Sequence, residues 1–185
     1  MPTEKEKMLR GELYRGASAQ LTRERQRARD LLRFLNASRE EEQELRQRIV
    51  TNLFGAVGDR IGIEPPFYCD YGNNIYLGSD VFINFNCVFL DEARVDIGDH
   101  VLFGPNVQLY TGSHPLDVET RRKYLEFAKP IRIGSDVFVG GRAIVCPGVT
   151  IGDGSVIGAG SVVTKDIPDG VVAAGNPCRV LRALE

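Results

Sequence analysis

The chain has 185 residues, of which 43% are hydrophobic and 26% charged, so it can bury a core and is not intrinsically disordered. Its formal net charge of −2 gives no reason to expect a nucleic acid or an anionic membrane as a partner. No apolar stretch reaches membrane-spanning length, and the charged start MPTEKEKMLRGELY lacks the apolar core of a signal peptide, so we expect a cytoplasmic protein.

Residues 1–55 have the pattern of a helical segment. Thr3 and Glu6 form a capping-box pattern ahead of a short first helix. A second helix is expected over about 19–36, and its apolar face comprises Leu21, Ala28, Leu32 and Leu35. Ser38 and Glu41 repeat the capping-box spacing and predict a third helix that ends at Gly55. The apolar face of this third helix comprises Leu45, Ile49 and Leu53.

From about residue 75 a period of six replaces the helical period. Large apolar residues keep one phase at Leu77, Ile83, Phe89, Ile97, Phe103 and Leu109, and then at Ile133, Val139, Val145, Ile151, Ile157 and Val163. A flat amphipathic sheet would have a period of two, whereas a period of six is the signature of β-helix repeats. We therefore predict a mainly β fold, with a left-handed parallel β-helix over 56–185 behind the helical segment.

Two irregularities interrupt this period. The spacing between Phe89 and Ile97 is eight, which predicts a bulged corner at 91–93. Between Leu109 and Ile133 lies a longer polar excursion, which predicts a loop inserted at about 110–130. Solenoids usually place insertions on one face, often the binding face, so chemistry is expected at this loop.

The insertion holds His114, one of two histidines in the chain, in the sequence TGSHP. A loop histidine is a candidate general base because its unperturbed pKa lies near neutrality. His100 has no such context and is interpreted as structural or exposed. Two histidines are too few for a three-histidine zinc site, and we expect no metal. The scattered cysteines, Cys69, Cys87, Cys146 and Cys178, are interpreted as small buried hydrophobes.

Polar residues also occur where β-helix repeats normally carry small or apolar ones. Asn84 and Asn86 lie in INFNCVFLDE, followed by Asp91 and Glu92 at the bulged corner. A polar side chain at such a position must find a partner or face a groove. Solvent-exposed corners are an equally simple explanation for each residue alone.

The ordered motifs GELY, ERQRARDLL, PPFYCDYGNNIYLG, INFNCVFLDE, GPNVQLYTGSHP, VTIGDGSVIGAGSVVTKDIP and AAGNPCRV carry a resemblance. Over essentially its whole length the chain is similar to the maltose and galactoside O-acetyltransferases, which are close relatives of the nodulation acetyltransferases. The resemblance implies an acetyl-CoA-dependent enzyme, a homotrimer, and active sites between neighbouring subunits.

Carried over residue by residue, the resemblance implies that His114 is the catalytic base. It implies substrate contacts at Asn84, Asp70, Glu92 and Arg25. It implies coenzyme A contacts at Gly104, Gly141, Ala159, Lys165, Arg179 and Arg182. This chain departs from the family at three places. It has Glu92 where galactoside-type members have aspartate, Phe138 in place of the usual tryptophan, and Tyr14-Arg15-Gly16 where an N-terminal substrate aspartate is expected.

The function implied is transfer of an acetyl group from acetyl-CoA to a sugar hydroxyl of the maltose or glucose type, with His114 as general base. An acetyltransferase for another hydroxyl or for an amino acceptor is the first alternative. A non-catalytic β-helix scaffold subunit is the second, and it predicts no thiol release from acetyl-CoA.

Overall fold

The computed structural model describes residues 1–184 and begins with two helices whose predicted features are confirmed. In α1 (Glu4–Leu9) the capping box is present, with Thr3 and Glu6 each accepting the other's backbone N–H. The helix α2 (Ala19–Ala37) buries the predicted apolar face, Leu21, Ala28, Leu32 and Leu35. None of the helices described within 1–184 is long and apolar enough to cross a membrane.

The third helix differs from its prediction at its beginning and on its buried face. The helix α3 (Gln43–Leu53) begins five residues after Ser38, whose hydroxyl instead donates to the Leu35 carbonyl at the end of α2. Its buried residues are Ile49, Val50 and Leu53, whereas Leu45 is 41% exposed. The capping-box prediction was wrong here because a serine can bond to the preceding turn as well as to the following one.

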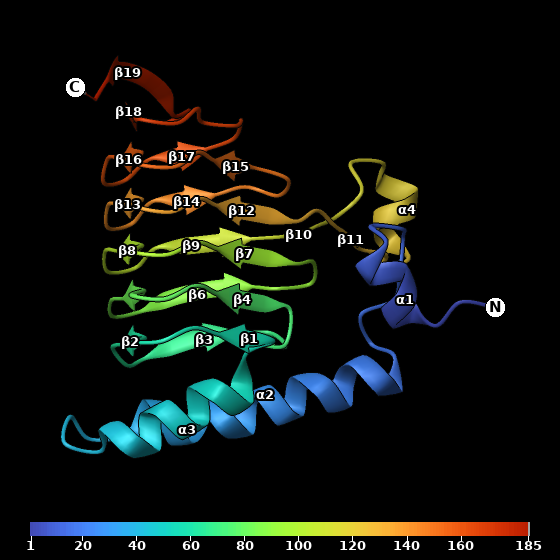
Figure 1. The fold of residues 1–185 in the computed structure, drawn as a ribbon. Coiled ribbons are helices and arrows are strands. Elements are labelled where there is room, and N and C mark those ends of the chain that lie inside the picture. Colours follow the sequence, from blue (N-terminus) through green and yellow to red (C-terminus); the bar gives the residue numbers. More distant parts are fainter. Residues whose placement is uncertain (185) are drawn as a thin grey trace.

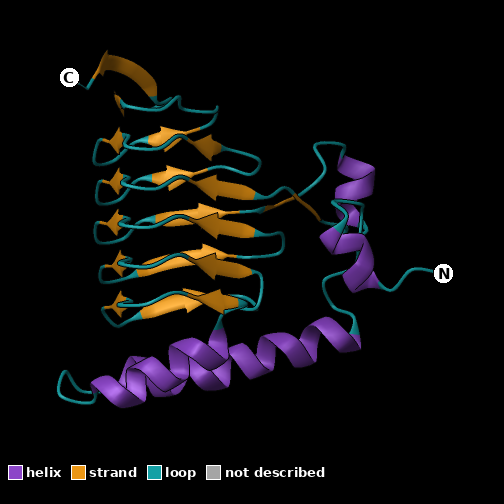
Figure 2. Ribbon diagram, in the orientation of Figure 1, coloured by secondary structure: helices purple, strands orange, loops and turns teal. Residues whose placement is uncertain are grey.

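Fifteen short strands wind into five coils of three strands each, stacked as a left-handed parallel β-helix (Figures 1 and 2). Face 1 consists of β1 (Ala56–Val57), β4 (Ile75–Leu77), β7 (Val95–Ile97), β12 (Ile131–Ile133) and β15 (Thr150–Ile151). Face 2 consists of β2 (Gly62–Ile63), β5 (Phe82–Ile83), β8 (Leu102–Phe103), β13 (Phe138–Val139) and β16 (Val156–Ile157). Face 3 consists of β3 (Phe67–Cys69), β6 (Cys87–Leu90), β9 (Gln108–Tyr110), β14 (Ile144–Val145) and β17 (Val162–Val163). At the C-terminal end β18 (Val171–Ala174) extends face 2, and β19 (Arg179–Ala183) folds back antiparallel to it.

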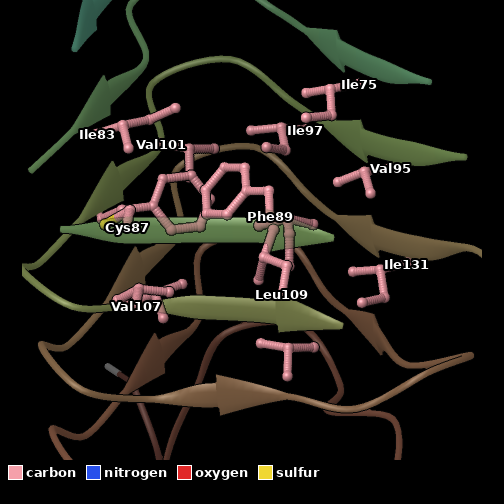
Figure 3. Close-up of a cluster of buried hydrophobic side chains, with 14 of the residues drawn as sticks. Ile75, Ile83, Cys87, Phe89, Val95, Ile97, Val101, Val107, Leu109 and Ile131 are labelled. Carbon is pink, nitrogen blue, oxygen red and sulfur yellow. The ribbon is translucent and has the colours of Figure 1, made fainter. Parts of the chain in front are cut away.

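The interior of the coils is a ladder of apolar side chains in register, as the period of six predicts. Phe89 is fully buried, and its ring meets those of Phe67 and Phe103 edge-on, with centroids 5.2 Å away in each case. Figure 3 shows Phe89 pointing inward among aliphatic side chains from the neighbouring coils, including Ile97 and Leu109. This packing makes the coils a rigid support for their corners.

The first coil lies within the predicted range 56–185, although it precedes residue 75, from which the period of six was recognised. Val57, Ile63 and Cys69 already have the spacing of six, and Cys69 pairs with Phe89 of the next coil. From Cys69 to Leu77 the spacing is again eight, so the bulge predicted at 91–93 has an equivalent at 70–74.

The bulges and the insertion share one edge of the molecule, the corner between face 3 and face 1, here called corner 3/1. It comprises 70–74, 91–94 and 111–130 in three successive coils. The insertion leaves the solenoid as an antiparallel ribbon of β10 (Gly112–Ser113) and β11 (Phe127–Ala128) that leads to α4 (Val118–Arg122). In Figure 1 this ribbon projects away from the coils and reaches α1.

Candidate active site

The bulge at corner 3/1 is organised by a buried carboxylate, Asp91, which is 0% exposed. Its oxygens accept the backbone N–H groups of Asp70, Tyr71 and Asn74 at 3.1, 2.8 and 3.3 Å. Burial raises the pKa of Asp91 to about 7, although the backbone donors act in the opposite direction. The exposed-corner explanation is therefore wrong for Asp91, which fixes the coil below it.

The neighbouring carboxyl group, Glu92, is also buried and meets Asp70 of the coil below. The Thr111 hydroxyl donates to Glu92 at 3.1 Å, and Gly112 leaves room for the carboxyl group, since a Cβ there would lie 2.7 Å from its carbon. Burial raises the pKa of Glu92 because it disfavours the charged form of the carboxyl group. The adjacent Asp70 raises this pKa further because it disfavours a second negative charge beside its own. Asp70 and Glu92, which the sequence places 22 positions apart, therefore form one polar patch.

Arg25, on α2, contacts Tyr71, the residue that follows Asp70. Its Nη1 donates to the Tyr71 hydroxyl at 2.8 Å, and its guanidinium lies 5.7 Å from the centroid of the same ring. Tyr71 is buried, and burial raises the pKa of its hydroxyl. Tyr71 follows Asp70 directly, so the network around Asp91 also fixes the residue that contacts Arg25.

His114 lies at the outer end of the β10–β11 ribbon and is exposed. Its Nδ1 is 3.4 Å from the Leu125 carbonyl oxygen on the other side of the insertion. A carbonyl oxygen can only accept, so this contact favours the tautomer with the proton on Nδ1 and the lone pair on Nε2. A neutral imidazole in this tautomer has the free lone pair on Nε2 that a general base requires.

The remaining predicted residues on the coils share a different edge, the corner between face 2 and face 3, here called corner 2/3. Backbone hydrogen bonds align the turns 84–86, 104–106, 140–142 and 158–160 there in successive coils. Asn84, Gly104, Gly141 and Ala159 therefore lie in one column of mostly small residues. Within residues 1–184 the N–H groups of Gly141 and Ala159 form no hydrogen bond, whereas Gly104 donates to Val139 at 2.8 Å.

The three predicted cationic residues are all exposed but do not share one edge. Arg179 pairs with Ala174 on β18, directly above the turn 158–160 of corner 2/3, and Arg182 pairs with Val172. Lys165 follows β17 and lies at corner 3/1, above the insertion. Two of the three cations therefore belong to the β18–β19 hairpin and one to the edge that carries His114.

One chain thus places the predicted residues at two separate edges of the coils rather than at one. Corner 3/1 carries Asp70, Glu92, His114 and Lys165, and corner 2/3 carries Asn84 with the glycine column. Sequence reasoning missed Tyr71, Thr111, Tyr14 and Glu126, which contact the predicted residues or the insertion. The double acidic pattern at 91–92 was the one signal that pointed to the network around Asp91.

The other residues considered above have plain surroundings. His100 is 60% exposed, and its Nδ1 lies 3.5 Å from Asp80. Cys69, Cys87 and Cys178 are buried, Cys146 is half-buried, and all four are free thiols. Within residues 1–184 no group of three or more histidine, cysteine, aspartate or glutamate side chains is arranged to hold a metal ion.

Comparisons with known proteins show what this chain is similar to. The family model described as the maltose acetyltransferase hexapeptide capping motif matches 7–58, and the hexapeptide repeat of succinyl-transferase matches 130–165. The galactoside O-acetyltransferase of Escherichia coli is 44% identical, and the match covers 97% of this chain and 88% of that protein.

Two solved structures have the same fold over the whole chain. A maltose O-acetyltransferase from Clostridium difficile 630 superposes with a TM-score of 0.98 at 49% identity, covering 100% of this chain and 98% of that one. A galactoside acetyltransferase in complex with coenzyme A gives a TM-score of 0.96 at 43% identity, covering 100% and 92%. On these grounds the chain belongs to the maltose and galactoside O-acetyltransferase family of hexapeptide-repeat acetyltransferases.

Proposed function

We propose that this protein transfers an acetyl group from acetyl-CoA to a sugar hydroxyl, with His114 as general base. The observation that carries the proposal is the contact between His114 Nδ1 and the Leu125 carbonyl, which favours a free lone pair on Nε2. Similarity to a galactoside acetyltransferase bound to coenzyme A supports the choice of acyl donor.

The reaction proceeds by direct attack on the thioester. His114 Nε2 removes the proton of the acceptor hydroxyl as its oxygen bonds to the thioester carbonyl carbon. The tetrahedral intermediate then collapses, the C–S bond breaks, and the imidazolium returns the proton to the departing sulfur. Acetylated sugar and free coenzyme A leave with no change in redox state, and the enzyme is regenerated.

The backbone of corner 2/3 supports the developing negative charge. Gly141 has an N–H group with no hydrogen bond to residues 1–184, so it can donate to the oxyanion. The small residues of this column leave room for an extended ligand along the edge. Asn84, Asp70, Glu92 and Arg25 orient the acceptor, and Lys165, Arg179 and Arg182 hold the phosphates of coenzyme A electrostatically.

The proposal requires more than one copy of the chain, because His114 and Asn84 lie at different corners. The outward side chains of face 2 are apolar, namely Phe82, Leu102, Phe138, Val156 and Val172. The outward side chains of face 1 are mostly polar, namely Tyr76, Asp96, Arg132 and Thr150. Packing of face 2 against another copy around a threefold axis would cover this apolar surface and place the sites between subunits, as in the homotrimer that the family resemblance implies.

Sedimentation equilibrium is therefore expected to give a mass close to three times 20.5 kDa. Leu102→Glu, on the outward side of face 2, should shift the protein towards monomers and lower turnover, because it places a charge in the apolar contact. Thr150→Glu, on the outward side of face 1, is the matched control and should leave both unchanged. A stable and fully active wild-type monomer would contradict the trimer and the shared site.

Lys165→Ala and Arg182→Ala are expected to raise KM for acetyl-CoA more than they lower kcat. Both side chains are expected to contribute ground-state binding energy to the phosphates, and this energy is present equally in the transition state. Arg29→Ala removes an exposed cation from α2 and serves as a control. Steady-state kinetics with acetyl-CoA varied at saturating acceptor provides the measurement, and unchanged values in both variants would mark them as surface charges only.

The acceptor is tested by a panel of hydroxyl and amino compounds with acetyl-CoA, monitored by release of free thiol. Maltose, glucose and galactosides should react. The segment Tyr14-Arg15-Gly16, where relatives are expected to have an aspartate, favours a second candidate, an acetyltransferase for another hydroxyl or an amino group. If thiol is released only with such compounds, the second candidate is selected. If no acceptor causes thiol release, the result indicates a scaffold protein.

A further inference from the structure

The insertion that carries His114 is fastened to the N-terminal segment by Tyr14, which lies between α1 and α2. Tyr14 and Glu126 exchange backbone hydrogen bonds of 3.0 and 3.1 Å, and the Tyr14 hydroxyl donates to the Glu126 carboxylate at 2.9 Å. Burial and the adjacent carboxylate raise the pKa of Tyr14, so the hydroxyl remains a donor. These three contacts join residues 112 positions apart in the chain.

The surroundings of Tyr14 make this junction rigid. Tyr14 is 0% exposed and packs with Met8, Leu21 and Tyr71 in a cluster separate from the core of the coils. Gly16 lies against the Glu126 carboxylate, where a Cβ would be 3.0 Å from the nearer oxygen. A fully buried tyrosine that binds a single partner on a projecting loop fixes the position of that loop.

The position of the loop matters because Glu126 directly follows Leu125, whose carbonyl accepts from His114 Nδ1. Apart from this junction, the described residues support the loop through two ribbon pairs, Gly112 with Ala128 and Ser113 with Phe127, and a 3.1 Å hydrogen bond from Arg15 Nη1 to the Lys123 carbonyl. We infer that Tyr14 and Glu126 are positioning residues for the transfer reaction, which hold the Leu125 carbonyl where it orients the His114 imidazole. This inference rests on the proposed role of His114 as the base.

Tyr14→Phe keeps the ring and removes the donor, so it tests the junction with little change in packing. We expect kcat to fall about 10-fold and KM for acetyl-CoA to stay unchanged. A misplacement of about 1 Å can cost about 10²-fold in rate, and losing one hydrogen bond of the junction should displace the loop by less. Glu126→Gln still accepts the Tyr14 hydroxyl and should keep most of the activity, whereas Glu126→Ala should lose at least as much as Tyr14→Phe. If Tyr14→Phe fails to fold, the comparison of Glu126→Gln with Glu126→Ala still tests the junction.

Two comparisons separate positioning from a general structural role. Lys5→Met breaks the 2.8 Å ion pair with Glu24, which joins α1 to α2 without touching the insertion, and should leave kcat unchanged. In the His114→Ala background, Tyr14→Phe should cause no further loss, because the group that it positions is absent.

Wild-type kcat in Tyr14→Phe and Glu126→Ala would overturn the inference. So would a further loss in the His114→Ala background, or an equal loss in Lys5→Met. If His114→Ala itself keeps its turnover, the proposed function fails. If His114→Ala is inactive while Tyr14→Phe is fully active, only the present inference fails.

Discussion

Turnover in His114→Ala is expected to fall by about 10²–10⁴-fold, the usual contribution of a positioned general base. The side chain lies outside the apolar ladder and is exposed, so its removal leaves no core cavity. Coenzyme A affinity should change little, since its proposed contacts are at corner 2/3, on the β18–β19 hairpin and at Lys165. Single-turnover kinetics together with calorimetric titration of coenzyme A separate the two effects.

The contact with Leu125 offers a closer variant. His114→Asn keeps a polar side chain of similar reach but supplies no base near neutral pH. We expect it to be as inactive as the alanine variant and as stable as the wild type. His100→Ala is the matched control, because it removes the other histidine, which is 60% exposed, and it should retain full turnover. Wild-type turnover in His114→Ala with a good acceptor would exclude the general-base role.

Phe89→Ala is expected to lower the free energy of unfolding by about 3–5 kcal/mol, the usual cost of truncating a buried phenylalanine. Phe89 is fully buried, and its ring contacts those of Phe67 and Phe103 in the coils below and above. The cavity would therefore interrupt the ladder in the middle of the three coils that carry the bulges and the insertion. Urea denaturation followed by circular dichroism provides the measurement at one fixed protein concentration.

Phe34→Ala is the matched control, because this phenylalanine lies on α2 and is 59% exposed. Its expected effect is within the few tenths of a kcal/mol usual for surface positions. A loss at Phe89 no larger than at Phe34 would show that the ladder relaxes around the cavity, and that the rigid support attributed to it is absent.

The local repeat accounts for what could be predicted about the fold. Each coil face accepts one large apolar residue inward, so the period of six in the sequence reports the coil directly. The insertion was visible as an interruption of that period. The start of α3 was not predictable in the same way, because Ser38 has two competing local partners and only packing selects between them.

The sequence by itself determined the β-helix, the insertion with His114, and, through its ordered motifs, the family. Only the tertiary structure decided which polar residues meet. The stacking of coils brings Asp70 to Glu92 and buries Asp91 beneath the same bulge. It also separates His114 from Asn84 and joins Tyr14 to Glu126. The period of six specifies which side chains point inward, because it is a local pattern of the sequence. The contacts at the corners depend on the register between coils and on how far the insertion reaches. Neither of these is determined by residues that are neighbours in the chain.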